Sequence, residues 1–178
     1  MCWYGNLTDK KIATKDMVCY KVIAMYGGQY YAYYRGTEYH IGETYKEKVY
    51  PIKTLSLDNA THKLYRGLHC YSHLCNFYIC DASNDKCFNV TNPTKAFMYS
   101  HIGEQLIGHY CISNLYTYDE CGNEKLFVKN AIPELVKCII PEGTVYYENK
   151  RGEIVTTKFI LSEVVREGFG KNGKLIKK

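Results

Sequence analysis

The sequence lacks the signals that would assign this chain to a membrane or to export. No segment reaches the roughly 18 consecutive apolar residues that a membrane-spanning helix needs. The first residues lack a basic start followed by an apolar core, so no secretory signal peptide is predicted. Nine cysteines without an export signal favour a reducing compartment and free thiols. We therefore expect a cytoplasmic protein with no membrane partner.

The chain has little excess of positive over negative charge outside its last residues. The net charge is +5, but four of the lysines lie in residues 171–178, so the remainder carries about +1. A protein that binds duplex nucleic acid needs a concentrated basic face, and we expect no such partner. We interpret residues 169–178 as a basic flexible tail. Residues 1–168 are predicted to form a single globular domain.

Motifs for catalysis and cofactor binding are also missing. The sequence contains neither a lysine-bearing phosphate loop nor Gly-x-Gly-x-x-Gly. The segment from residue 69 to residue 87 holds two histidines and four cysteines, but four, four and six residues separate those cysteines, unlike the Cys-x2-Cys of zinc knuckles. No family signature surrounds a cysteine–histidine pair that could act as a nucleophile and base. We predict no metal, no cofactor and no catalytic residue, with the thiols buried in packed strands.

Segments with strand character dominate the chain. A hairpin is predicted from residues 18–25, through the turn at Gly27 and Gly28, to a return strand at residues 29–34. Residues 135–140 form a nearly continuous apolar run, which indicates a central strand. Other strands are predicted at residues 39–41, 64–70, 76–80, 144–147 and 153–157.

One segment carries the signals of a helix start. Asn92 can cap free backbone amides, and Pro93 suits the first helical position. A helix is predicted to continue through residues 96–98 and toward residue 107, and residues 159–165 are either a final strand or a helical turn. The predicted fold class is α+β, a single, mainly antiparallel β-rich domain with one or two short helices.

Tyrosine is the enriched residue, with nineteen in the chain and six between positions 20 and 34. A tyrosine ring offers a flat apolar face and a polar tip, which suits flat polar ligands. Two Tyr-Arg-Gly segments add arginines beside aromatic rings, a pairing expected for a nucleotide base and its phosphate. Tyrosine also tolerates half-burial in ordinary sheets, and this alternative stays open. The predicted ligand-binding residues are Tyr31, Tyr33, Arg35, Tyr65, Arg66 and His69.

Several segments together resemble small uncharacterised proteins of phage and prophage accessory genomes. These segments are Met1-Cys2-Trp3, residues 20–23, the Gly-Leu-His-Cys of residues 67–70, and the Ile-Ile-Pro-Glu-Gly-Thr-x-Tyr-Tyr of residues 139–147. The resemblance implies a viral or mobile-element origin, and some phage proteins of this size sequester nucleotide immune signals.

The order of these segments also resembles ADP-ribosyltransferase-like folds. Those enzymes carry an arginine or histidine on the first strand and a glutamate late in the fold. Residues 19–22 contain neither basic residue type, Glu142 follows a proline in a turn, and Glu124 has no flanking motif. A matching fold would therefore have an altered or absent transferase site.

The first hypothesis is a non-catalytic, phage-type accessory protein that binds a small nucleotide-like ligand in the cytoplasm of the host. Its tyrosines would stack on the ligand, and Arg35, Arg66 or His69 would contact the phosphate. One alternative is an ADP-ribosyltransferase-like enzyme or its inactive relative, and the other is a protein-interaction or structural module. The sequence leaves open whether the protein forms a homo-oligomer.

Overall fold

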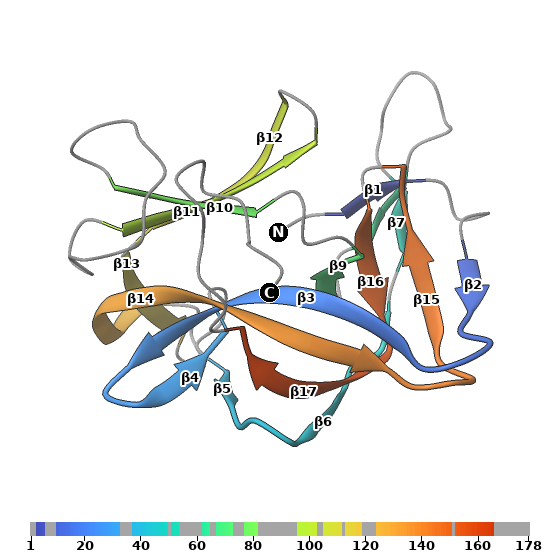
Figure 1. The fold of residues 1–178 in the computed structure, drawn as a ribbon, viewed down its shortest axis with the longest axis horizontal. Helices are drawn as coiled ribbons and strands as arrows, with labels where there is room; N and C mark the ends of the chain where they lie inside the picture. Colours follow the sequence, from blue (N-terminus) through green and yellow to red (C-terminus); the bar gives the residue numbers. More distant parts are fainter. Residues whose placement is uncertain are drawn as a thin grey trace. The chain divides into compact units, whose positions relative to one another are not determined.

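The structure of this chain is a computed structural model that describes part of the sequence. Its backbone is described for residues 3–5, 10–32, 37–49, 51–53, 62–64, 67–72, 77–81, 96–102, 105–111, 113–118, 124–150 and 152–165. Side chains are described for residues 10–32, 37–49, 67–72, 115, 131, 133–150 and 152–165. Every regular element among these residues is a β-strand (Figure 1). None of them belongs to a helix that is long and apolar enough to cross a membrane.

The described strands form one large sheet and two small ones. The strands of the large sheet are β2 (Lys10–Ile12), β3 (Met17–Tyr26), β4 (Gln29–Tyr31), β5 (Glu38–Tyr39), β6 (Thr44–Lys46), β9 (Leu68–Tyr71), β13 (Ser113–Tyr118), β14 (Glu124–Ile140), β15 (Val145–Glu148), β16 (Glu153–Thr156) and β17 (Lys158–Val164). Their main order is β2-β15-β16-β9-β3-β14-β17-β6, with β4, β5 and β13 paired off this path. The small sheets are β1-β8-β7, built from Trp3–Gly5, His62–Leu64 and Pro51–Lys53, and β10-β11-β12, built from Phe77–Asp81, Ala96–Ile102 and Gln105–Cys111.

The chain divides into two compact units. The first unit comprises Met1–Lys21, Ile41–His73 and Val136–Glu163, and the second comprises Val22–His40, Leu74–Leu135 and Val164–Lys178. Strands β3 and β14 contribute residues to both units, as does β17 through its last residue, Val164. The single domain over residues 1–168 stays a prediction, and the predicted tail at residues 169–178 lies outside the described residues.

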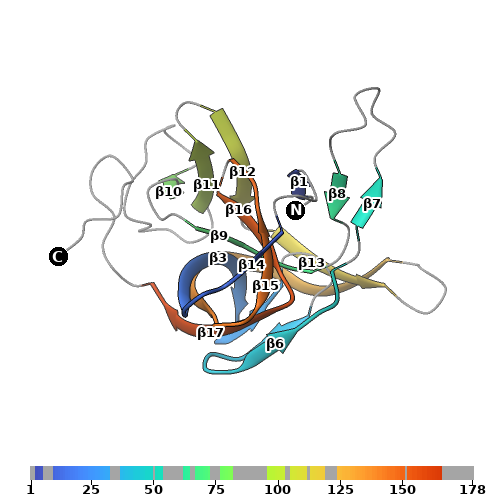
Figure 2. The same ribbon diagram turned by 90° about the vertical axis from the view of Figure 1, so that its right-hand side faces the viewer.

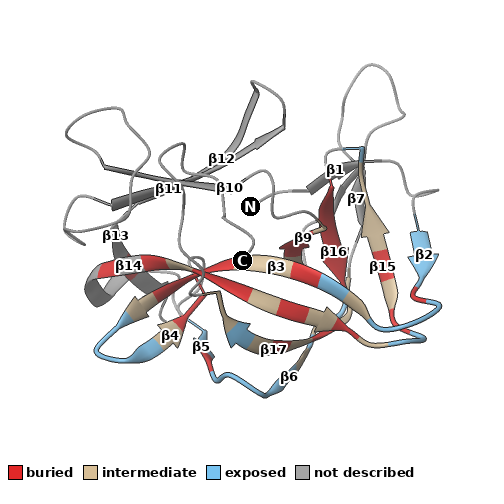
Figure 3. Ribbon diagram, in the orientation of Figure 1, coloured by how far each residue is buried: buried red, intermediate tan, exposed pale blue. Residues whose placement is uncertain are grey.

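Strand β16 forms the centre of the first unit's core. All four of its residues are buried, and it pairs with β15 on one side and β9 on the other (Figure 3). The buried Glu153 is tolerated here because its carboxylate accepts a 2.6 Å hydrogen bond from Asn149 Nδ2. The Glu153 backbone N–H in turn donates to Asn149 Oδ1 at 3.1 Å. The strands predicted at residues 144–147 and 153–157 are thus confirmed, and they pair as a hairpin with Tyr146 opposite Thr156.

The hairpin of β3 and β4 is confirmed in the second unit. Tyr26 lies opposite Gln29, and Gly27 and Gly28 between them have φ angles of 58° and 83°. Two successive positive φ angles give the tight turn whose twist matches antiparallel strands, and glycine adopts them at low cost. The central strand predicted at residues 135–140 is also confirmed as the end of β14, which lies between β3 and β17.

The predicted α+β class is wrong, because the described residues contain strands and no helix. The expected helix through residues 96–98 and toward residue 107 is replaced by β11 and β12. Strand β11 pairs with β10 on one side and β12 on the other. The backbone of β11 therefore forms hydrogen bonds with strands on both sides, which a short stretch of sequence does not reveal. These cross-strand bonds outweigh the local preference for a helix. The cap residues Asn92 and Pro93 lie outside the described residues.

Residues 159–165, which the sequence predicted as either a final strand or a helical turn, belong almost entirely to strand β17. It covers Lys158–Val164 and pairs with β6 at the end of the large sheet (Figure 2). The acidic and lysine-rich segment that contains β6 is mostly exposed, as an edge strand requires.

Gly67 precedes β9 where the chain passes close to other backbone and side chains. Its φ angle is +127°, and a Cβ at this position would lie 2.9 Å from Val49 Cγ2 and closer still to Val155 Cγ1. We expect Gly67→Ala to lower the free energy of unfolding by roughly 2–4 kcal/mol, measured by urea denaturation.

Gly42 offers the matched control, because it has a φ angle of +91° but nothing lies within 4 Å of the point that a Cβ would occupy. Gly42→Ala should cost only the backbone strain, roughly 1–2 kcal/mol. Equal losses in the two variants would show that crowding around Gly67 contributes nothing to stability.

Candidate functional site

The structure places Tyr31, a predicted ligand-binding residue, in a core cluster. Its exposed fraction is 6%, and it packs with Ala24, Leu115 and Ala131 in the second unit. Its hydroxyl donates a 2.6 Å hydrogen bond to Gln29 Oε1. Desolvation raises the pKa of Tyr31, and the charge of Glu38 adds to the rise. The ring face is therefore occupied by core packing.

The second predicted residue that the structure describes is His69, in the first unit. It is half-buried on β9 opposite Val155, and its carbonyl accepts a 2.8 Å hydrogen bond from Lys21 Nζ. The Lys21 ammonium also lies 5.7 Å from the centre of the Phe159 ring. Lys21 thus connects the backbone at His69 to the Phe159 ring, and these contacts stabilise the sheet.

The other four predicted site residues lie outside the described residues. They are Tyr33, Arg35, Tyr65 and Arg66. Their assignment to a ligand site stays a prediction.

Three buried thiols meet in the core of the first unit. Cys19, Cys70 and Cys138 come from β3, β9 and β14, which are neighbours in the sheet, and each has an exposed fraction of 0%. Cys19 Sγ donates to the Cys138 carbonyl oxygen at 3.6 Å. Hydrogen bonds with Cys138 and Cys70 raise the pKa of Cys19, and desolvation raises it further. A protonated, buried thiol is a poor nucleophile, so this cluster acts as packing.

Metal coordination finds no support in the described part of the chain. Its side chains include no group of three or more His, Cys, Asp or Glu arranged to hold a metal ion. Cys75, Cys80 and Cys87 of the sequence cluster have no described side chain.

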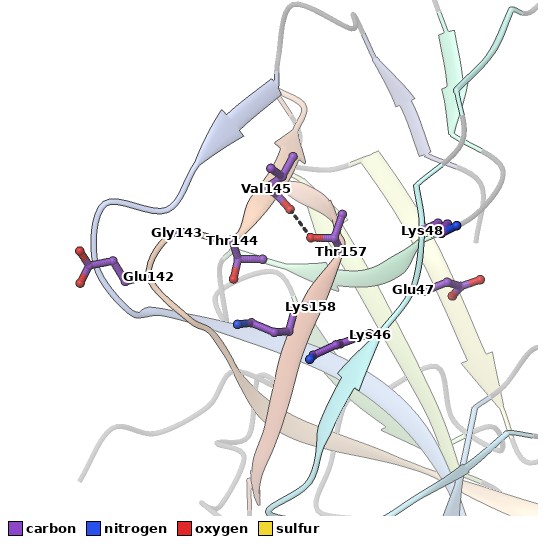
Figure 4. Close-up of a pocket in the computed structure, with 9 residues that line it drawn as sticks. All are labelled: Lys46, Glu47, Lys48, Glu142, Gly143, Thr144, Val145, Thr157 and Lys158. Carbon is purple, nitrogen blue, oxygen red and sulfur yellow. Dashed lines mark hydrogen bonds between the residues drawn. The ribbon is translucent and has the colours of Figure 1, made fainter.

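An open groove in the first unit is lined by several charged and polar side chains. It has a volume of about 490 Å³, within the range of small-ligand sites. Its walls come from β6 and the residues after it, the turn before β15, and the start of β17 (Figure 4). The lining residues are Lys46, Glu47, Lys48, Glu142, Gly143, Thr144, Val145, Thr157 and Lys158.

A hydrogen-bonded junction fixes the floor of this groove. The Val145 carbonyl oxygen lies 3.1 Å from Thr156 Oγ1, 3.2 Å from Thr157 N and 3.3 Å from Thr157 Oγ1. The Thr156 hydroxyl also lies 3.1 Å from the Lys158 carbonyl oxygen. These contacts hold the bend between β16 and β17, so the backbone at Lys158 is fixed relative to β15.

Strand register places two lysines of the groove directly opposite each other. Lys158 pairs with Lys46, and the next pair along the strands is Phe159 with Tyr45. Side chains alternate along a strand, so the aromatic pair turns to the core and the lysine pair turns to the opposite face. The rings of Tyr45 and Phe159 lie 6.1 Å apart and Phe159 is fully buried, which fixes this orientation.

The two lysines form an unfavourable pair in the free protein. Like charges directly opposite on antiparallel strands repel each other. Neither ammonium has an ion pair among the described residues. Figure 4 shows both ammonium groups on the same side of the strands, with Glu47 and Lys48 on the other side. The pair therefore presents concentrated positive charge to the groove.

Thr144 adds a buried hydroxyl to the same groove. The residue is 5% exposed, and its Oγ1 has no hydrogen-bond partner among the described residues. Its backbone is held at both groups, because its N–H donates to Pro141 O at 3.1 Å and its carbonyl accepts from Ala13 N at 3.0 Å. In Figure 4 the hydroxyl points toward the side occupied by the ammonium of Lys158. This buried hydroxyl gains a hydrogen bond when an acceptor of the ligand reaches it.

Sequence reasoning missed this site, although part of its signal was present. The strand at residues 144–147 was predicted, and Lys46 and Lys48 lie close together in the sequence. The pairing of Lys46 with Lys158 depends on the register of β6 and β17, which are more than one hundred residues apart in the sequence. Local patterns do not encode that register.

We expect Thr144→Val to raise the free energy of unfolding, by up to about 1 kcal/mol, because valine keeps the shape and removes an unpaired buried hydroxyl. Urea denaturation measures the change. The matched control is Thr156→Val, since Thr156 is fully buried but its hydroxyl is bonded. That variant should lose roughly 1–3 kcal/mol. A loss of the same size at Thr144 would contradict an unpaired hydroxyl.

Alkaline pH should destabilise the protein through Cys19. Its folded-state pKa is raised, so the folded thiol keeps its proton above pH 9.0, where the unfolded chain loses it. The contribution of Cys19 to the free energy of unfolding is therefore fully present below pH 9.0. It falls as the pH rises above that value, by up to about 1.4 kcal/mol per pH unit. Urea denaturation from pH 8 to 10.5 measures this slope. Cys19→Ala should flatten it, and an unchanged slope in that variant would contradict the assignment.

Comparison with known proteins places this geometry in no family. No protein-family model matches the sequence, no curated protein matches it, and no solved structure matches it. The function is therefore argued from the residues of the groove itself.

Proposed function

We propose that the protein is a non-catalytic accessory protein of phage type that binds a small, nucleotide-like ligand in the cytoplasm of the host cell. The groove lined by Lys46, Thr144 and Lys158 would hold the anionic part of that ligand. The observation that carries the proposal is the pair of unneutralised lysines beside an unpaired, buried hydroxyl. The phage-type origin rests on the sequence resemblance alone.

The chemistry of the groove favours an anion over a neutral ligand. Two ammonium groups face the same space, and their mutual repulsion is relieved when an anion lies between them. Lysine acts as a point charge for phosphate and carboxylate groups. The groove's volume of about 490 Å³ accommodates a small molecule beyond the anionic group itself.

The rigidity of the groove also supports binding. The Val145 junction and the two backbone hydrogen bonds of Thr144 hold the backbone of the groove in place. A preformed site spends less of its interaction energy on ordering its own groups when the ligand arrives.

The predicted tyrosine and arginine residues form a second candidate location for the same ligand. Arg35 and Arg66 lie outside the described residues, so their contribution stays a prediction. Substitution distinguishes the two locations, since a charge change affects affinity only where the anion binds.

We expect charge reversal at the lysine pair to abolish ligand binding. A panel of mono-, di- and cyclic nucleotides and ADP-ribose is screened by thermal shift, and affinities of the stabilising members are measured by titration calorimetry. Lys46→Glu should lower affinity at least tenfold, because it replaces attraction by repulsion at the anion. The free variant should melt at or slightly above the wild-type temperature, since it places opposite charges across the strands.

The control variant is Lys150→Glu, a change of the same charge at an exposed turn residue that does not line the described groove. It should retain wild-type affinity. Two results would refute the proposal: no stabilisation by any member of the panel, or loss of binding in Arg35→Ala and Arg66→Ala with full binding in Lys46→Glu. The second result would move the ligand to the arginine segments.

A further inference from the structure

We propose that the groove selects a terminal phosphate monoester, as a dianion, over cyclic or bridging phosphodiesters. This inference rests on the proposed function and specifies the chemical class of its ligand. It follows from three features of the same site: the number of positive charges, the number of donors and the openness of the groove.

The charge of the site matches a dianion. Two ammonium groups, Lys46 and Lys158, lie opposite each other without a carboxylate partner among the described residues. Figure 4 places the Glu142 carboxylate pointing away from them at the far edge of the groove. A terminal phosphate carries about −1.5 to −2 charges near neutral pH, whereas a phosphodiester carries a single one. Only the monoester brings about one negative charge for each of the two opposed lysines.

The donors of the site match a terminal phosphate as well. A monoester offers three free oxygens, and a diester offers only two that are not bridging. The site provides the two ammonium groups and the Thr144 hydroxyl, whose Oγ1 has no partner among the described residues. The hydroxyl is already unpaired, so it gains a hydrogen bond only from a ligand that brings an acceptor to it, and a ligand with a third oxygen is favoured.

The groove is open, so the phosphate can bind with its free oxygens inward while the rest of the ligand extends out of the groove. The lysines sit near the end of the large sheet, where β6 is the last strand of the main path. A terminal phosphate enters such an open site with its ester oxygen directed outward. A cyclic phosphate has two ester oxygens tied to the same sugar, so it cannot present a three-oxygen end to the groove.

Adenosine 5′-monophosphate and adenosine 3′,5′-cyclic monophosphate form a matched pair of probes, because they share base and sugar and differ in the phosphate. Titration calorimetry at pH 7.5 should show about tenfold tighter binding of the monoester. The preference should shrink at pH 5.0, where the monoester gains a proton because its second pKa is about 6. Ribose 5-phosphate and inorganic phosphate separate the contribution of the phosphate from that of the base.

The pH dependence needs the cyclic probe as an internal reference. The titratable side chains that line the groove are Lys46, Lys48, Lys158, Glu47 and Glu142. Protonation of Glu47 or Glu142 at pH 5.0 would favour both probes, and the dianion more strongly. A preference for the monoester that shrinks at pH 5.0 therefore reports the proton gained by the ligand.

Two substitutions test whether the preference arises at this site. Lys158→Gln and Thr144→Val should each reduce the monoester preference to about threefold or less, because each removes one partner of the dianion. Lys150→Gln, the same charge change at an exposed position outside the described groove residues, should keep the full preference. Circular dichroism of each variant confirms that the comparison is made on folded protein.

The possible outcomes separate the inference from the proposed function. A monoester preference that depends on Lys158 and Thr144 supports the inference. Equal or tighter binding of the cyclic probe overturns it and leaves the proposed function standing. A preference that persists in both variants also overturns it, since the selective site then lies elsewhere. Absence of binding by all four probes at millimolar concentration contradicts the proposed function together with the inference.

Discussion

The carbonyl oxygen of Val145 is the acceptor on which the geometry of the groove depends. It lies within 3.3 Å of three donors, the two threonine hydroxyls and the Thr157 amide, at the bend between β16 and β17. This bend directs β17 to pair with β6, and the register of that pair sets Lys158 opposite Lys46. The buried strand β16, its hairpin partner β15 and the edge strand β6 are thereby held in fixed positions. The lysine pair follows from these positions.

The groove combines two features that a sequence selected only for stability would avoid. Opposed lysines repel each other across the strands, and the buried hydroxyl of Thr144 lacks a hydrogen bond among the described residues. Both become favourable when an anion binds, because the charges are neutralised and the hydroxyl gains an acceptor. Local conflicts of this kind in an otherwise well-packed unit are typical of binding sites. The thiols of Cys19, Cys70 and Cys138, in contrast, fit their apolar surroundings.

Local patterns were sufficient for the hairpins and insufficient for the site. The glycine pair at residues 27–28 and the apolar run at residues 135–140 predicted a turn and a central strand, because each signal acts over a few residues. The helix predicted beyond Pro93 was wrong, since the cross-strand partners of β11 come from outside the local window. The lysine pair required a register between β6 and β17. The enrichment in tyrosine identified Tyr31, whose ring the structure places in a core.

An NMR titration of uniformly labelled protein with adenosine 5′-monophosphate locates the bound anion without a substitution. If the anion binds in the groove, amide shifts will grow with ligand concentration and cluster at residues 46–48, 143–145 and 157–158, which line it. Shifts concentrated around β4 and β5 in the second unit, or spectra that do not change at millimolar ligand, would contradict binding in the groove.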